Sequence, residues 1–339
     1  MQRTGATPVI RVGGAAALLP LLVEHGLDAD AIVAEVGLSR AVFQDPDHVV
    51  PFAALCRVAN LAAERTGLGD VGLRACEKTG LASLGTVGYL MANSETVAHS
   101  LAALETYLYV HDQGATPVVA RDGTTAHLGY EVLAPESPGA DQITFGALAI
   151  AANVMRQLCG PEFKLRQAEI RYRAPADTSQ FRRFFDAPVR FEAERSAIAF
   201  DARWLASPIP NADPYLRSVL ADRIHGEMAR MGDTADDRIR RVVRSMVAGG
   251  RFSVDDAAAA FGMNRRTLAR RLGERGTRFR ELLDDARHDE ARRLLRSVES
   301  PVAKIAEQLG YSDATSFTRA FVRWAGMSPR EWRRRHCAI

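Results

Sequence analysis

The chain has 339 residues, of which 47% are hydrophobic and 25% charged, and its net charge is +3. This length predicts two domains, each large enough to bury its own core. No apolar run is long enough to span a membrane, and the 8 histidines lack a metal-binding spacing such as HExxH, so we expect no membrane association, metal or other cofactor. Cys56, Cys76, Cys159 and Cys337 are scattered without CxxC pairing, which indicates free thiols in a reducing cytoplasm.

Residues 15–113 are predicted to be mostly helical, because apolar residues recur there at helical spacing between glycines and capping residues. The apolar stretch 15–23 is also typical of a signal peptide, but Pro20 interrupts it and Glu24 follows it. We therefore interpret it as part of the first core helix. The expected helices cover residues 15–26, 28–36, 51–67, 70–79, 84–93 and 96–111.

The pattern changes after residue 113. Residues 116–121 and 125–133, on either side of Asp122-Gly123, predict a β-hairpin with a two-residue turn. We therefore expect residues 1–205 to form a mixed α+β domain that serves sensing and dimerisation. Its later elements are expected to be a long apolar helix over 141–160, strands over 165–173 and 197–200, and a helix near 178–185.

Polar residues near the predicted core elements are the candidates for binding a small-molecule effector. An apolar cavity with a few convergent polar groups is the usual form of such a site. Buried tyrosines and histidines more often satisfy hydrogen bonds of the core, so the effector-binding residues stay unassigned. No nucleophile elbow, phosphate loop or carboxylate pair indicates a catalytic residue or an enzyme. The candidates are Tyr107, Tyr109, His111, His127, Arg156, Arg171 and Tyr172.

Residues 206–233 are predicted to be a linker that carries an amphipathic helix. Ser207-Pro-Ile-Pro210 breaks the chain, and Gly232-Asp-Thr234 marks the boundary and caps the first helix of the next domain. The helix over residues 214–231 either packs back onto the first domain or forms a dimer contact, and the pattern favours neither. Its apolar side consists of Leu216, Val219, Leu220, Ile224 and Met228.

Residues 234–339 are predicted to be all-helical, and they contain the same two-helix pattern twice. In the first copy, Ala258 lets two helices cross closely, Gly262 ends the first helix in the left-handed conformation, and Asn264 caps the second. Leu268 and Leu272 then lie four residues apart on one face. This is the pattern of a helix-turn-helix motif.

The second copy repeats the pattern 48 or 49 residues later, with Ala306, Gly310 and Ser312, followed by Phe317 and Phe321. One such match is weak, whereas two at a constant offset are specific. A helix over residues 277–297 is expected to join the copies, and at about 1.5 Å per residue it would be roughly 31 Å long. Successive major-groove faces of DNA lie roughly 34 Å apart, so the two copies are predicted to read one side of a duplex.

Charge separates the two predicted domains. Residues 234–339 contain 23 basic and 14 acidic residues, a net charge of +9, whereas residues 1–233 carry −6. A basic module joined to an acidic one is typical of a phosphate-binding domain attached to a sensing or pairing domain. The alternative is a generic solvated helical bundle, but the excess of arginine coincides with the motif.

The second domain resembles the DNA-binding domain of AraC/XylS-type bacterial transcription regulators. The resemblance covers residues 234–335, and Asn264 stands where the family usually has serine, which caps equally well. The stretches that carry it are 262–272 (GMNRRTLARRL), Arg287, 291–295 (ARRLL), 305–312 (IAEQLGYS), 316–321 (SFTRAF), 324–329 (WAGMSP) and Arg333.

The first domain resembles, more loosely, the amino-terminal domain of the ornithine- and arginine-responsive regulators of that family. This subgroup's domain is described as arabinose-binding-like, but its ligands are mostly undefined, so no ligand contact is carried over. The helical beginning differs from the β-rich cupin of the sugar-sensing members. The resemblance lies in Val50-Pro51 and in residues 69–73, 85–89 and 94–98.

The DNA-binding residues are expected on the exposed faces of the second helix of each copy. In the first copy, Arg266 and Arg270 are the candidates for guanine contacts, and Arg265 and Arg271 for phosphate contacts. The alternative is that these arginines only pair with nearby carboxylates. Asp313 is expected to cap a helix. At the positions that match the family's groove contacts, the second copy presents Ala314, Thr315, Arg319 and Arg323.

These features predict a cytoplasmic, sequence-specific transcription regulator that binds double-stranded DNA, and the family resemblance implies an activator that contacts RNA polymerase. We expect a homodimer that senses a small-molecule effector or another signal. The first copy should dominate affinity, while the second should tolerate more sequence variation. The alternatives are a non-specific architectural DNA binder and an enzyme domain fused to a DNA-binding module.

Overall fold

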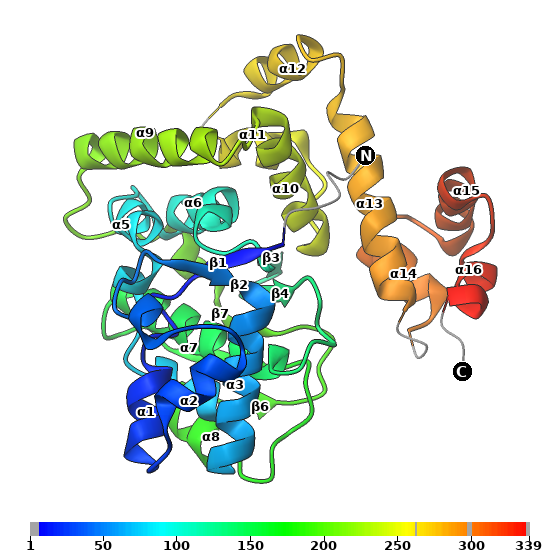
Figure 1. The fold of residues 1–339 in the computed structure, drawn as a ribbon. Coiled ribbons are helices and arrows are strands. Elements are labelled where there is room, and N and C mark those ends of the chain that lie inside the picture. The colour runs from blue at the N-terminus through cyan, green and yellow to red at the C-terminus, as the bar shows by residue number, and fades with distance from the viewer. Residues whose placement is uncertain (1–6, 262, 297–299, 337–339) are drawn as a thin grey trace. The chain divides into compact units, whose positions relative to one another are not determined.

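A computed structural model describes residues 7–261, 263–296 and 300–336 of the chain. The chain separates into two compact units, Met1–Gly232 and Asp233–Ile339 (Figure 1). Each unit encloses its own cluster of buried apolar side chains. Among the described residues, no helix combines the length and the apolar character that crossing a membrane requires.

The first unit begins with helices, as the sequence predicts, and two short strands that it does not. Val9 pairs with Pro51 and Arg11 with Val49, so three residues at the amino terminus are held against the start of α3. The elements are β1 (Val9–Arg11), α1 (Leu18–Glu24), α2 (Ala29–Glu35), η1 (Arg40–Phe43), β2 (Val49–Pro51), α3 (Phe52–Thr66), α4 (Val71–Cys76), η2 (Leu81–Leu84), α5 (Thr86–Ala92), α6 (Val97–Tyr107) and η3 (Leu108–Val110).

A five-stranded sheet follows, in the order β3-β4-β7-β5-β6, with β5 and β6 parallel and the other pairs antiparallel. The predicted hairpin forms, but Asp122 pairs with Thr125, so the two turn residues are Gly123 and Thr124, one position later than expected. Gly123 supplies the positive φ of +55°. The elements are β3 (Ala115–Asp122), β4 (Thr125–Val132), α7 (Ala140–Cys159), β5 (Leu165–Glu169), α8 (Ser179–Phe185), β6 (Val189–Arg190), β7 (Ala197–Asp201) and η4 (Ala202–Ala206).

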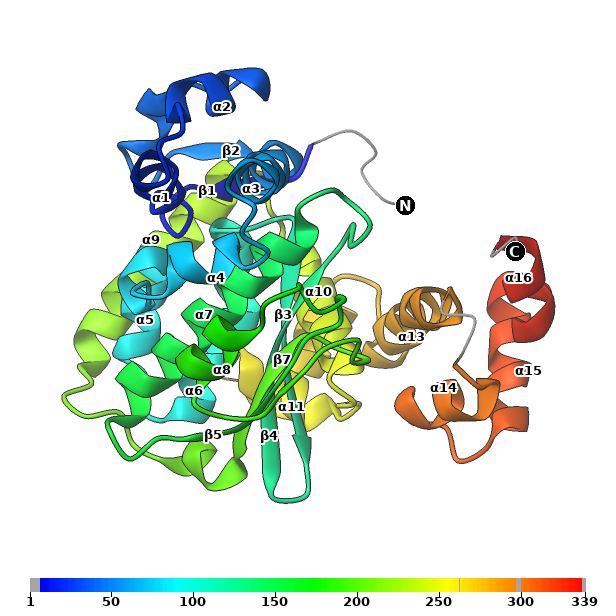
Figure 2. The same ribbon diagram turned by 90° about the horizontal axis from the view of Figure 1, so that it is seen from below.

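The long helix α7 is the centre of this unit. It packs against β4 and β7 of the sheet and against α3 and α4 of the helical part (Figure 2). Its approach to α4 is so close that a Cβ atom on Gly72 would lie 1.9 Å from the carbonyl oxygen of Gln142. Gly146 faces Cys76 in the same way, with 2.9 Å between an added Cβ and the sulfur. Glycine is therefore required where these two helices cross.

Helix α9 (Pro214–Arg230) belongs to the first unit. Asp213 caps it by accepting hydrogen bonds from the backbone N–H groups of Tyr215 and Leu216. Of the apolar side predicted from the sequence, Ile224 and Met228 are fully buried against the unit. The other end of that side stays exposed at Leu216 and Val219, and the neighbouring Tyr215 is exposed as well.

The second unit is all-helical, in agreement with the predicted fold class. Thr234 caps α10 in a reciprocal capping box with Asp237, and α10 packs along α13. The joining helix α13 spans 17 residues, or about 26 Å, so the expected length of 31 Å is wrong. Thr277 and Arg278 belong to the turn before the helix, and Arg296 is its C-cap. The elements are α10 (Ala235–Ala248), α11 (Val254–Ala260), α12 (Arg265–Gly273), α13 (Phe279–Leu295), α14 (Val302–Gln308), α15 (Ala314–Ala325) and α16 (Pro329–His336).

Candidate nucleic-acid interface and effector cavity

The first helix-turn-helix copy is α11 with α12. Ala258 is buried where the helices cross, and the side chain of Asn264 accepts a hydrogen bond of 2.9 Å from the backbone N–H of Thr267, which begins α12 as predicted. Leu268 and Leu272 are buried. The expectation that Gly262 ends α11 lies outside the described residues.

The four arginines predicted to meet DNA in this copy are all exposed on α12. Burial of Leu268 and Leu272 fixes the inner face of the helix, so the arginines project away from it. The Nη1 atom of Arg270 lies 2.7 Å from the carboxylate of Glu274, which is the nearby-carboxylate pairing weighed from the sequence. Among the described residues, no ion pair involves the other three, Arg265, Arg266 and Arg271.

The second copy is α14 with α15. Asp313 caps α15, as expected for that residue, whereas Ser312, at the position that matches Asn264, does not. The carboxylate of Asp313 accepts a 2.7 Å hydrogen bond from the backbone N–H of Ser316. The Ser312 hydroxyl donates to the same carboxylate at 3.0 Å. Hydrogen bonds from the backbone and hydroxyl of Ser316 lower the pKa of Asp313 to about 2. The turn of this copy is thus one residue longer than that of the first.

The expected groove residues of the second copy lie along one helix. Thr315, Arg319 and Arg323 are exposed on α15, and Ala314 is half-buried at its first position. Arg323 pairs with Asp284 at 3.2 Å. No described residue forms an ion pair with Arg319. Gly310 has φ +75°, as predicted for the residue that ends α14.

Arg287 of α13 connects the two copies, a role that the sequence did not reveal. Its guanidinium lies 4.7 Å from the ring of Phe252, which precedes α11, and 5.1 Å from the ring of Tyr311, in the turn of the second copy. A Cβ atom added to Gly310 would lie 2.4 Å from the same Phe252 ring. Arg287 is among the residues that carry the family resemblance. Sequence spacing alone could not show that it contacts Phe252, a loop residue 35 positions earlier.

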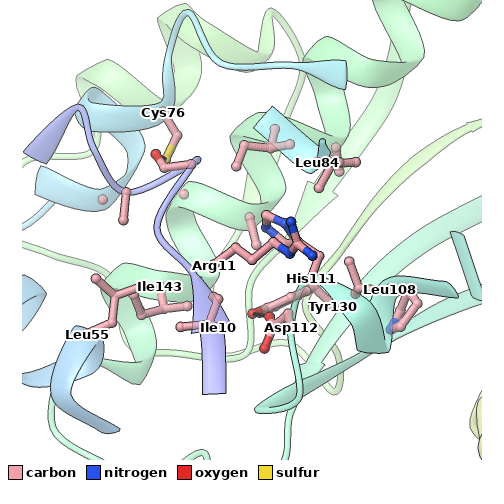
Figure 3. Close-up of a pocket in the computed structure, with 18 of the residues that line it drawn as sticks. Ile10, Arg11, Leu55, Cys76, Leu84, Leu108, His111, Asp112, Tyr130 and Ile143 are labelled. Carbon is pink, nitrogen blue, oxygen red and sulfur yellow. Dashed lines mark hydrogen bonds between the residues drawn. The ribbon is translucent and has the colours of Figure 1, made fainter. Parts of the chain in front are cut away.

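A cavity of about 120 Å³ lies within the first unit, between α7, β4 and the amino-terminal helices (Figure 3). Its wall is mainly apolar, with Leu55, Leu84 and Ile143 among its side chains. Of the effector candidates proposed from the sequence, His111 alone lines it. The polar residues that sequence reasoning missed in this wall are Arg11, Asp112, Tyr130 and Gln142.

The remaining candidates make hydrogen bonds or ion pairs elsewhere in the unit. Tyr107 contacts His225 of α9 at 3.1 Å, and Arg156 donates to the carbonyl oxygen of Phe184 at 2.7 Å. His127 lies 3.8 Å from Glu169, and burial lowers its pKa. Tyr109 does not line the cavity. Arg171 and Tyr172 reach Glu131 at 4.0 Å and the carbonyl oxygen of Pro135 at 3.4 Å.

Two family models match the chain. The "Arabinose-binding domain of AraC transcription regulator, N-term" matches residues 26–209, which is more than half of the chain, and a "Helix-turn-helix domain" matches residues 257–335. The chain belongs to the AraC family of transcription regulators. The family and the arabinose-binding-type first domain predicted from the sequence are thereby confirmed.

Two bacterial regulators resemble this AraC-family chain along most of its length, and a third resembles a shorter part of it. It is 29% identical to the HTH-type transcriptional regulator VirS of Mycobacterium tuberculosis, over 92% of the chain and 93% of VirS. It is 24% identical to the ornithine utilization regulator of Pseudomonas aeruginosa, over 96% of each. The transcriptional activator NphR of Rhodococcus sp is 34% identical over 30% of each chain. A crystal structure of the regulator CdpR from P. aeruginosa, 23% identical, covers 95% of this chain and 98% of its own with a TM-score of 0.47.

Proposed function

We propose that the chain is a sequence-specific regulator whose helices α12 and α15 both enter the major groove of a promoter. The observation that carries this is the pair of capped helices with outward-facing arginines within residues 234–339, whose net charge is +9. Arg266 and Arg270 would contact base edges, while Arg265 and Arg271 would neutralise phosphates. On α15, base or backbone contacts would come from Ala314, Thr315, Arg319 and Arg323.

We propose that the protein acts in the cytoplasm and that its first unit binds the effector and forms the dimer. Its cavity would hold a small-molecule effector, and the exposed apolar residues Tyr215, Leu216 and Val219 of α9 would pair two chains. We propose that the chain activates transcription, the role that the name of the relative NphR, a transcriptional activator, states for that protein, and that it does so by contacting RNA polymerase. Sedimentation of the Val219→Asp variant tests the proposed dimerisation, and this variant should be monomeric. An unchanged dimer would show that another surface pairs the two chains.

The DNA-binding proposal is tested in two steps. A genome-wide binding map first supplies the promoter sequence that the chain occupies. Gel shifts at physiological salt then compare this duplex with a scrambled duplex of equal length and composition. We expect at least a thousandfold preference for the promoter duplex, as specific binders show. Equal affinity for both duplexes would replace the proposal with an architectural DNA binder.

A further inference from the structure

The cavity of the first unit has one polar corner, and the rest of its wall is apolar apart from Gln142, whose side chain bonds the backbone of Gly69 and Gly72. The corner contains Arg11 from β1, and His111 and Asp112 just after η3, while Tyr130 reaches it from β4 (Figure 3). The half-buried residues Ala147 and Ala151 of α7 line the apolar part of the wall. The arrangement is that of a small-molecule site, because a few fixed polar groups orient a ligand that the apolar wall encloses.

His111 offers the free hydrogen-bonding atom of this corner. Its side chain is 8% exposed, and its Nδ1 atom is buried without a hydrogen-bond partner. Buried polar atoms in native proteins nearly always have partners, so the orphaned ring nitrogen of a residue that lines the cavity leaves one hydrogen bond to be made. Burial and the charge of Arg11 lower the pKa of His111 to about 4, and the ring is therefore neutral at physiological pH.

The charged groups of the corner already have partners. Arg11 donates to Asp47 at 2.5 Å, to Glu227 of α9 at 2.9 Å and to the carbonyl oxygen of Val110 at 3.2 Å. Its single positive charge thus faces two carboxylates. Asp112, 2% exposed, accepts a hydrogen bond from the Tyr130 hydroxyl at 2.5 Å and another from the backbone N–H of Gly114 at 2.8 Å. No cation of this corner is left to hold an anionic ligand.

We propose that this cavity binds a small, uncharged and mainly apolar molecule with one hydroxyl group, the size of a simple phenol or short alcohol, whose hydroxyl bonds Nδ1 of His111. A hydroxyl both donates and accepts, so it satisfies either neutral tautomer of the ring. The inference rests on the effector role proposed above and specifies the ligand for it.

Size and polarity both point to this class. An apolar cavity of about 150 Å³ is known to hold benzene, so the 120 Å³ here fits one ring or a short chain. A sugar would bring several hydroxyls that the apolar wall could not satisfy, and each unpaired buried group costs about 1–3 kcal/mol. An amino acid zwitterion would in addition need a partner for its carboxylate, and Arg11 is already shared by Asp47 and Glu227.

Four single-ring probes that differ in their polar group test the inference on the full chain by titration calorimetry. They are benzyl alcohol, toluene, benzoate and benzylamine. We expect benzyl alcohol to bind at one site, about fivefold tighter than toluene because of one additional hydrogen bond. Benzoate and benzylamine should bind more weakly than either. Tightest binding by benzoate, or no saturable binding by benzyl alcohol, would overturn the inference.

Two variants locate the bound probe. His111→Leu should reduce the affinity for benzyl alcohol to that for toluene and leave toluene unchanged, and Ala147→Leu should weaken both at least tenfold by filling the cavity. The matched controls His99→Leu and Ala98→Leu, at exposed positions of α6, should change neither affinity. Folding of each variant is checked by its melting temperature without probe. Binding that survives Ala147→Leu in a folded variant places the probe elsewhere and refutes the site.

The same preparations are assayed for promoter DNA, which separates this inference from the proposed function. Specific DNA binding without probe binding would overturn the ligand class and leave the regulator in place. Probe binding at His111 without specific DNA binding would support the cavity and contradict the regulator. Probe binding that changes the promoter affinity supports both.

Discussion

The two helix-turn-helix copies share a backbone pattern but are built from different side chains. The first copy packs α12 through the aliphatic residues Leu268 and Leu272. The second packs α15 through Phe317 and Phe321, whose ring centroids lie 5.8 Å apart, with Trp332 of α16 against Phe321 at 6.3 Å. The comparison teaches that the motif fixes where a helix is buried and capped, and leaves open what fills its core.

The exposed faces of the two recognition helices also differ, because α12 carries more positive charge than α15. Four arginines project from α12, whereas α15 presents Arg319 and Arg323 beside the uncharged Ala314 and Thr315. We therefore expect the first copy to contribute more of the electrostatic affinity and the second more of the stability of the unit. Substitutions in the core and on the exposed faces can measure the contributions to stability and to DNA affinity separately.

Loss of an aromatic core residue should destabilise the second unit most. Phe321 is fully buried among aromatic rings, so Phe321→Ala should lower the free energy of unfolding by about 3–5 kcal/mol. Leu268→Ala, the matching change in the first copy, should lower it by less. Urea unfolding of the full chain, followed by the fluorescence of Trp324 and Trp332, measures both. Equal losses would mean that the aromatic packing adds nothing to the second copy.

Removal of one arginine from each recognition helix should weaken DNA binding while the fold remains intact. Arg270→Ala and Arg319→Ala are each expected to cost about 1–3 kcal/mol of specific binding. Arg265→Ala and Arg271→Ala should weaken binding to all sequences and reduce the salt dependence by about one ion each.

The control for these four variants is Arg57→Ala, an exposed arginine of α3 with the same loss of charge. Gel shifts with promoter and scrambled duplexes at several salt concentrations give the free energies and the slopes. Unchanged affinity and footprints in both Arg270→Ala and Arg319→Ala would remove these residues from the interface.

Arg287 should couple the copies, because its guanidinium lies over one ring from each. A cation–π contact contributes about 0.5–2 kcal/mol, so Arg287→Ala should lower the free energy of unfolding by about that amount. Double-mutant cycles with Phe252→Leu and Tyr311→Leu should show coupling to both rings. Arg280→Ala, an exposed arginine on the same helix, is the control. Additive effects in both cycles would show that the copies are stabilised independently.

The sequence predicted those parts of the fold that depend on local chemistry. Asn264 and Thr234 cap helices because a short polar side chain reaches the backbone N–H groups of the next turn. The hairpin beside Gly123 forms for a similarly local reason. Asp313 caps α15 as predicted, whereas Ser312, predicted as a cap because it matches Asn264, does not, because the turn of the second copy is one residue longer than that of the first.

The features that sequence reasoning missed are produced by tertiary contacts. The polar corner brings together Arg11, His111 and Tyr130 from three separate elements. No periodicity connects these positions. The pairing of β1 with β2 was also missed, because a strand of three residues is too short to show an alternation of apolar and polar residues. For the second unit, the length of α13 was overestimated because the expected range included Thr277 and Arg278, although the apolar residues at helical spacing begin only at Phe279.

The smallest predicted difference between the copies is a dependence on pH. The folded pKa of Asp313 is about 2, below its ordinary value of 3.8, so the stabilisation by this cap is complete above pH 4 and is lost as the pH falls toward 2. Asn264 does not titrate, so the first copy should lack this dependence. Melting temperatures of the wild type and Asp313→Asn, compared between pH 5 and pH 2, should differ most at the upper end and converge at the lower.

The reciprocal change tests whether the cap itself, rather than other carboxylates, produces this dependence. Asn264→Asp places a titrating cap on the first copy, where it can accept the same hydrogen bond from the backbone of Thr267. Its melting temperature relative to the wild type should then fall between pH 4 and pH 2, in the way that the second copy behaves. A pH-independent difference for Asn264→Asp would show that position in the helix is not enough. The first copy has Thr267 at the position of Ser316 but Met263 at that of Ser312, so the hydroxyl of Ser312 would then be what holds the pKa of Asp313 low.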